Sequence, residues 1–207
     1  MAIDGQLRVA GLVVAGLALA GGAWAGPPFP WWSTIDPRLV LCPAGDVAFH
    51  VIPRRISTPV AGAQLSVDFC QATGWAFDPA GQSASIHFFG PACTPSVFAD
   101  ATGLATMALE AGGGTADSTV YLYVDGVPFG RRFLTSPDQN GDLLVNAADE
   151  AILLAKLGSN DLSADFDADG VVTEADHQFQ RAHLGHSAEQ PTATSARSWG
   201  RLKIAYR

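Results

Sequence analysis

The sequence predicts a mostly β fold, a β-sandwich, followed by a small pair of α-helices that each follow a polar loop. Apolar residues alternate with polar or small ones from Leu39 to about Phe133, which is the period of β-strands. Clusters of Pro, Gly and Asp separate these runs at short intervals, as turns do. Between Asp138 and Gly185 one pattern of polar and apolar residues occurs twice, 27 positions apart.

Residues 1–25 have the pattern of a secretory signal peptide. Arg8 precedes an apolar run from Val9 to Ala20, and Ala23-Trp24-Ala25 is a small-x-small cleavage site. An uncleaved membrane anchor is the alternative. No later segment of the sequence is long and apolar enough to cross a bilayer. We therefore expect a secreted or cell-surface protein with no membrane span after signal cleavage.

Composition limits the classes of partner. The formal net charge of −8 disfavours nucleic acid and anionic membrane surfaces. Half of the 20 acidic residues lie between Asp138 and Asp176, where they recur at fixed spacing. A length of 207 residues allows one or two domains, and a hydrophobic content of 48% is enough for a core.

The three cysteines predict one disulfide and one free thiol. Cys70 and Cys93 both fall at the ends of strand-like runs, and we expect them to be bonded to each other. Cys42 is then expected to be a small buried apolar residue. No C-x-x-C pair and no histidine cluster accompanies the cysteines in the sequence, so no zinc site is expected.

Residues 26–38 are rich in Pro and Trp and are expected to form an extended lead-in. Trp31 and Trp32 are expected to cover the edge of the following domain. The alternative is that they stack on a sugar ring.

Residues 39–134 are expected to form the β-sandwich, because several short strands at this spacing are typical of that architecture. The alternating runs are Val47–Ile52, Leu65–Phe69, Ile86–Phe88, Ala105–Leu109 and Val120–Val124. The glycine run 112–114 lacks a following lysine and helix, and is expected to be a hairpin loop. The sequence also lacks G-x-S-x-G and H-E-x-x-H motifs, so no enzymatic activity is expected.

Two stretches of this body resemble bacterial immunoglobulin-like domains of invasin-type adhesins. They are Thr58 to Val67 (TPVAGAQLSV) and Ala99 to Met107 (ADATGLATM). The resemblance implies an immunoglobulin-like sandwich used as a spacer or adhesive module, without an active site.

The duplicated segment places oxygen-bearing side chains at loop positions 1, 3, 5 and 12, the spacing of a calcium-binding loop. Position 7 would contribute a backbone carbonyl, and position 9 often acts through water. Calcium wants six to eight oxygen ligands, which only closely spaced Asp and Asn can supply. The expected ligands are Asp138, Asn140, Asp142, Leu144, Asn146 and Asp149 in the first loop, and Asp165, Asp167, Asp169, Val171, Thr173 and Asp176 in the second.

Each loop is followed by a segment with helical periodicity that stops at Gly158 or Gly185. Val145 and Val172, both at loop position 8, are expected to pair across the two loops. No helix precedes either loop, since Pro137 abuts the first one.

A calcium loop followed only by a helix, and duplicated, resembles the type I dockerin domain over residues 138–185. The family pattern is D-x-[ND]-x-D-G-x-V-x-x-x-D followed by a helix that ends in Leu-Gly. The resemblance implies two bound calcium ions and docking onto a cohesin-like partner, as in assemblies for polysaccharide catabolism.

Two departures from that pattern matter. Leu143 replaces glycine at position 6 of the first loop, so the second loop, with Gly170 and an extra carboxylate, is expected to bind calcium more tightly. The residues before position 12, where the family recognises cohesin, are Ala147-Ala148 and Glu174-Ala175 instead of a hydroxyl pair.

Residues 186–207 are expected to form a linker and a basic tail. The predicted function is an exported, non-enzymatic, dockerin-like calcium-binding module that joins an immunoglobulin-like domain to a protein assembly. The alternatives are a surface adhesin or spacer that calcium only stabilises, and a carbohydrate-binding accessory with Trp31, Trp32 or Trp75 as the sugar platform.

Overall fold

The computed structural model describes residues 26–72, 74–77, 82–113 and 118–188. The predicted signal peptide and nearly all of the predicted tail lie outside these residues. The elements are η1 (Pro30–Trp32), β1 (Thr34–Ile35), β2 (Arg38–Val40), β3 (Ala48–Ile52), β4 (Arg54–Arg55), β5 (Thr58–Pro59), β6 (Gln64–Asp68), β7 (Trp75–Phe77), β8 (His87–Phe88), β9 (Pro95–Phe98), β10 (Ala105–Ala108), β11 (Ala111–Gly113), β12 (Thr119–Val124), β13 (Val127–Thr135), α1 (Ala147–Lys156) and α2 (Glu174–Ala182).

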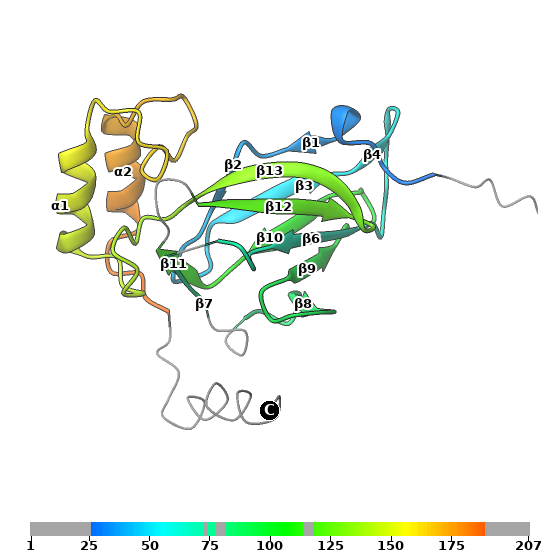
Figure 1. The fold of residues 1–207 in the computed structure, drawn as a ribbon, viewed down its shortest axis with the longest axis horizontal. Helices are drawn as coiled ribbons and strands as arrows, with labels where there is room; N and C mark the ends of the chain where they lie inside the picture. Colours follow the sequence, from blue (N-terminus) through cyan, green and yellow to red (C-terminus); the bar gives the residue numbers. More distant parts are fainter. Residues whose placement is uncertain (1–25, 73, 78–81, 114–117, 189–207) are drawn as a thin grey trace, which may run out of the picture.

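Two sheets form the β body, and the two helices lie side by side at one end of it (Figure 1). The larger sheet has six strands in the order β2-β13-β12-β6-β9-β8. The smaller has three strands in the order β1-β3-β10. Two-stranded pairs β11-β7 and β4-β5 flank them. The β2–β13 pair is parallel, and the other paired strands described are antiparallel.

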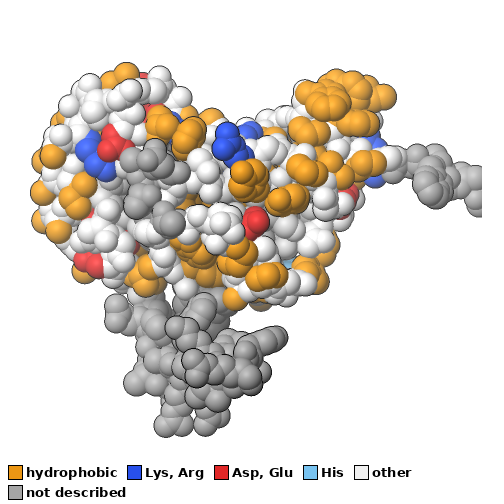
Figure 2. Space-filling model, in the orientation of Figure 1, with side chains coloured by type: hydrophobic (Ala, Val, Ile, Leu, Met, Phe, Trp, Pro, Cys, Tyr) orange, Lys and Arg blue, Asp and Glu red, His pale blue; other side chains and the backbone are white. Residues whose placement is uncertain are grey.

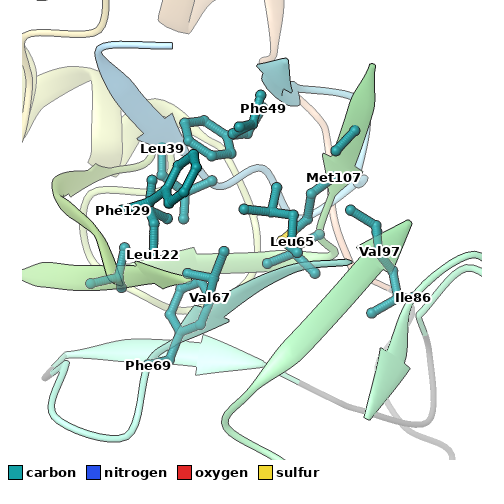
Figure 3. Close-up of a cluster of buried hydrophobic side chains, with 14 of the residues drawn as sticks. Leu39, Phe49, Leu65, Val67, Phe69, Ile86, Val97, Met107, Leu122 and Phe129 are labelled. Carbon is teal, nitrogen blue, oxygen red and sulfur yellow. The ribbon is translucent and has the colours of Figure 1, made fainter. Parts of the chain in front are cut away.

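The core lies between the six-stranded and three-stranded sheets, where the predicted alternation buries every second side chain (Figure 3). In β6, Leu65 and Val67 are fully buried while the residues between and beside them are half-buried. Phe49 of β3 and Met107 of β10 face them from the smaller sheet. Each such side chain contributes roughly 1.5–3 kcal/mol by leaving water. The predicted β-sheet core is therefore present.

The structure contains a disulfide between Cys70 and Cys93, whose Cα atoms are 5.2 Å apart. It links the loop after β6 to the loop before β9. Closing this loop stabilises the fold by about 3 kcal/mol through the entropy of the unfolded chain. Cys42 is a free, buried thiol.

The predicted fold class, an immunoglobulin-like sandwich followed by a helical dockerin-like pair, is wrong. The structure is mostly β, and its described residues contain only two short α-helices, of 10 and 9 residues, so a helical dockerin pair is not evident. The physical reason is that these helices bury too little to form a domain core alone. The residues buried in α2, for example, are only Asp176 and Gln180.

The helices instead share a small core with the β body. Leu153 of α1, Ala164, Phe166 and Val172 are buried together, and Val40 of β2 packs against them. Gln180, which stands where the first copy has Leu153, donates from Nε2 to the carbonyl of Pro137 at 2.8 Å. The loop–helix segment is thus part of one fold with the sheets.

Two local expectations also need correction. The lead-in is extended at strand β1 but is interrupted by the 3-10 turn η1. Gly112 and Gly113 are not a hairpin loop, since they lie in β11 and pair with Ala76 and Trp75 of β7. Among the described residues, no helix combines the length and the apolar character needed to cross a membrane.

Candidate functional site

The two acidic loops are held by the first turns of the helices that follow them. Asn146 and Thr173 are the N-caps of α1 and α2, and each accepts a hydrogen bond from the backbone two residues on. Asp149 and Asp176 stand at the third helical position and accept from the N-cap N–H, which completes a capping box. The capping boxes aim the position-12 carboxylates back into the loops.

In the first loop, three carboxylates converge around Asp138. Its Oδ1 accepts from Gly141 N at 2.8 Å and its Oδ2 from Leu143 N at 2.9 Å. Asp149 accepts from Asn140 N at 3.0 Å and from Asn146 N at 2.8 Å. Asp138, Asp142 and Asp149 each offer an oxygen, and these oxygens lie within 4.8 Å of one another. Asp138 and Asp149 are completely buried.

Such crowding is unfavourable without a cation. Burial raises the pKa of Asp138, and the nearby charges of Asp149 and Asp142 add to the shift, against hydrogen bonds from Leu143 and Gly141 that lower it. The pKa of Asp167 in the second loop is raised in the same way, by desolvation and then by neighbouring carboxylates. A bound cation would remove this repulsion.

The second loop repeats the arrangement with one difference. Asp165, Asp167 and Asp176 offer oxygens within 4.8 Å of one another, and Asp176 accepts from Phe166 N at 2.6 Å and Thr173 N at 2.8 Å. Asp165 Oδ2 accepts from Gly170 N at 3.1 Å and from the guanidinium of Arg38 at 2.6 Å. Asp165 Oδ1 is buried and has no hydrogen-bond partner. An unpartnered buried carboxylate oxygen fits a metal ligand.

Both loops have the same backbone, although their glycines stand at different positions. Position 4 is left-handed in each, at Gly141 (φ 76°) and Ala168 (φ 64°). Position 6 is also left-handed, at Leu143 (φ 65°) and Gly170 (φ 96°). Leu143 therefore does not prevent the loop shape, and each loop contains one strained residue that is not glycine.

The other predicted ligands have different positions. Asn140 is exposed, and its Nδ2 donates to Asp142 Oδ2 at 3.1 Å. Asp169 is also exposed and accepts from Val171 N at 2.9 Å, outside the group of three converging carboxylates. The side chains of Asn146 and Thr173 cap helices. Leu144 and Val171 have exposed side chains, which leaves only their carbonyls as ligands.

Val145 and Val172 do not pair with each other, contrary to expectation. Val172 O accepts from Gly158 N, and Val145 O accepts from Gly185 N, both at 2.8 Å. Each loop thus pairs with the glycine that ends the other copy's helix. The reason is that the two units pack head to tail, which the sequence pattern alone does not show.

The β body supports both loops through residues that the sequence did not single out. A Cβ added to Gly112 would lie 2.1 Å from Asp138 Oδ2, so the backbone of β11 closely approaches the first loop. Gly113 N also donates to Asp138 O at 3.1 Å. Arg38 of β2 reaches the second loop and lies over the ring of Phe133. Without knowledge of the topology, neither contact had a detectable sequence signal.

The three tryptophans proposed as sugar platforms differ in exposure. Trp75 is half-buried, packs against Phe69 and Phe77, and donates its indole N–H to Ala72 O. Trp31 and Trp32 are 74% and 44% exposed and contact Phe29. Figure 2 shows hydrophobic side chains gathered over this turn, at the end of the body away from the helices. Of the three, Trp31 and Trp32 are the more exposed.

Comparisons of this chain with protein-family models, with curated proteins and with solved structures each found no match.

Proposed function

We propose that the chain is a non-enzymatic calcium-binding protein whose two acidic loops each hold one ion. The observation that carries this proposal is the burial of carboxylates in both loops. Asp138, Asp149 and Asp165 are 0% exposed and Asp176 is 1% exposed, and each has other carboxylate oxygens within 4.8 Å. Buried like charges are costly unless a cation neutralises them.

The donor set favours calcium over other metals. The predicted ligands are all oxygens, which suit a hard cation: carboxylate, amide and carbonyl oxygens in the first loop, and carboxylate, carbonyl and hydroxyl oxygens in the second. Sequence alone predicts a tighter second site because that loop has Gly170 at position 6 and one more carboxylate, but Leu143 adopts the same left-handed backbone as Gly170. Arg38 offsets the extra carboxylate. The four carboxylates of the second loop and the positive charge of Arg38 give a net charge of −3, which equals that of the three carboxylates in the first loop. We therefore expect two sites of similar affinity.

Among the functions predicted from sequence, calcium as a stabiliser of the fold is best supported. The first loop contacts the β body at Gly112, and the second loop contacts it at Arg38. The backbone carbonyl at position 8 of each loop also accepts a hydrogen bond from the glycine at the end of the other unit's helix. An ion in either loop would fix the helices against the sheets. Calcium would act on the whole fold and not on a detached module.

Thermal unfolding with and without calcium tests the proposal. At a calcium concentration a thousand times the Kd, each site adds about 4 kcal/mol, or roughly 10 °C for a chain of this size. Asp149→Asn and Asp176→Asn, at the ends of the two loops, should each remove part of the shift. Asp100→Asn, at an exposed turn of the β body, is the matched control. A chelated protein that melts at the same temperature as the calcium-loaded one would contradict the proposal.

Docking onto a cohesin-type partner stays a prediction. The residues just before position 12, Ala147, Ala148, Glu174 and Ala175, are exposed in both copies. A pull-down with a cohesin panel, with and without chelator, measures whether these positions take part in assembly. No calcium-dependent capture would remove that function and leave the stabilising role.

Binding of a polysaccharide also stays a prediction, now restricted to Trp31 and Trp32. Glycan-array binding that Trp31→Ala abolishes and Trp75→Phe leaves intact would support it.

A further inference from the structure

A second group of side chains that could bind a metal lies outside the two acidic loops. Cys42 and Asp46 come from the segment after β2, and His183 and His186 come from the end of α2. One ligand atom from each residue lies within 4.8 Å of the others. No zinc site is expected from the sequence, because about 140 residues separate the two halves of this group and no local pattern joins them.

The distances around His186 match the edges of a tetrahedron around zinc, and the distance between His183 and Asp46 is about 0.6 Å longer than such an edge. With Zn–S of roughly 2.3 Å and Zn–N or Zn–O of roughly 2.0–2.1 Å, sulfur and nitrogen lie about 3.5 Å apart and nitrogen and oxygen about 3.3 Å apart. Cys42 Sγ is 3.5 Å from His186 Nδ1. Asp46 Oδ2 is 3.2 Å from His186 Nδ1 and 3.9 Å from His183 Nε2.

The tautomer of His183 is fixed for coordination. Its Nδ1 lies 2.7 Å from the carbonyl of Phe179, which can only accept a hydrogen bond. Nδ1 therefore carries the proton, and the lone pair is on Nε2, the atom that faces Asp46. A ring N–H donated to a backbone carbonyl is the usual support of a metal-binding histidine.

The backbone at the group is also held in place. Cys42 O accepts from Gly45 N at 2.8 Å and from Ala111 N at 3.3 Å. His186 O accepts from Val145 N at 2.9 Å. The Cys42 side chain is completely buried, while the side chains of Asp46 and His186 are 42% and 31% exposed, so an ion can enter from solvent.

We propose that Cys42, Asp46, His183 and His186 form a structural zinc site that joins the β body to the end of α2. The site differs from the calcium loops in its ligands, because soft sulfur and imidazole donors select zinc over calcium. Binding deprotonates the thiol, and one proton leaves to solvent when the Zn–S bond forms. Four protein ligands leave no open position for a catalytic water.

The test uses the whole chain, purified without a histidine tag, with calcium in excess so that the acidic loops stay constant. Dialysis against Zn²⁺ followed by elemental analysis should give one zinc per chain. Co²⁺ in place of Zn²⁺ should give a near-ultraviolet thiolate-to-metal charge-transfer band and the visible spectrum of a tetrahedral ion.

Substitution of each half of the site should weaken zinc binding. Cys42→Ser should abolish the charge-transfer band, and His183→Ala and Asp46→Asn, at less buried positions, should each lower the affinity by more than the ~100-fold that loss of a residue supporting a ligand can cost. His87→Ala, at an exposed histidine of β8, is the matched control and should leave binding unchanged. If zinc does not bind, binds without the thiolate band, or binds equally well to His183→Ala, the proposal is overturned.

Discussion

At the scale of single residues, two left-handed positions carry the strain of the acidic loops. Ala168 and Leu143 adopt φ values of 64° and 65°, which cost about 1–2 kcal/mol in residues other than glycine. The equivalent positions in the other copy are Gly141 and Gly170. Because neither loop has glycine at both position 4 and position 6, each loop retains backbone strain that a glycine would relieve.

Ala168→Gly should therefore tighten calcium binding at the second loop. Only a methyl group is lost, so relief of up to about 1 kcal/mol should appear as roughly a fivefold gain in affinity in a calcium titration. Leu143→Gly is the corresponding change in the first loop, where the loss of a half-buried side chain reduces the gain. An unchanged or weaker affinity in Ala168→Gly would show that the loop is not strained there.

Arg38 also affects the second loop, because its guanidinium donates a hydrogen bond to one carboxylate oxygen of the buried Asp165. Arg38→Gln should destabilise the chelated protein by about 3 kcal/mol or more, since it leaves a buried carboxylate unpaired. Calcium should then restore more stability to the variant than to the wild type. Denaturant unfolding with and without calcium measures both effects, and Arg131→Gln on the exposed side of β13 is the control. Equal calcium gains in the two proteins would contradict competition for Asp165.

At the scale of elements, β11 and the first loop must lie in close contact. Gly112→Ala places a methyl group against Asp138 and should weaken calcium binding at that loop, by about tenfold for each 1.4 kcal/mol of strain. Gly90→Ala is the matched control, because its new methyl group would meet only Thr94 Oγ1, at 3.4 Å. Calorimetric titration measures the calcium affinity of both variants. Equal affinities would show that β11 does not influence the first loop.

The two helices are linked by His177 of α2 and Glu150 of α1, 2.8 Å apart. The hydrogen bond to Glu150 raises the pKa of His177 above 6.5, and Glu174 adds to the shift, while Arg181 also faces Glu150. Because the folded-state pKa is the higher one, this contribution to stability is complete below pH 6.5 and is lost as the pH rises through the raised pKa.

The calcium-loaded protein should therefore lose stability through this pair as the pH rises above 6.5. Glu150→Gln keeps a hydrogen-bond acceptor but removes the charge, and should flatten this part of the pH dependence. Thermal unfolding across the pH range measures it. The same slope in wild type and Glu150→Gln would exclude the pair as its source.

At the scale of the whole molecule, three groups of side chains that could bind a metal lie where the helices meet the sheets. The two acidic loops and the Cys42 group all connect residues 138–186 to the β body. The exposed aromatic turn at Trp31 lies at the opposite end (Figures 1 and 2). Calcium removal should consequently loosen one end of the molecule and leave the aromatic turn unaffected.

The sequence predicted features that depend on neighbouring residues. Alternation identified strands such as β6 and β12, and the spacing of Asp138, Asp142 and Asp149 identified a converging group. Features that depend on distant pairing were missed. The parallel pairing of β2 with β13 brings Arg38 beside Asp165, 127 residues away, and no local pattern encodes that contact.

The fold class failed for the same reason. The sequence pattern between Asp138 and Gly185 is that of two loop–helix units, but it does not show what covers their apolar faces. In the structure, Val40 of β2 contributes to the core around Leu153 and Val172, so the segment is not a separate helical domain. The buried Gln180 also interrupts the apolar face that an independent pair of helices would need.

Calorimetric titration of the chelated chain with calcium tests the central claim most directly. The two clusters of carboxylates, one in each loop, predict a stoichiometry of two calcium ions per chain. Asp149→Asn and Asp176→Asn should each reduce it to one. A stoichiometry of zero in the wild-type chain would contradict the account.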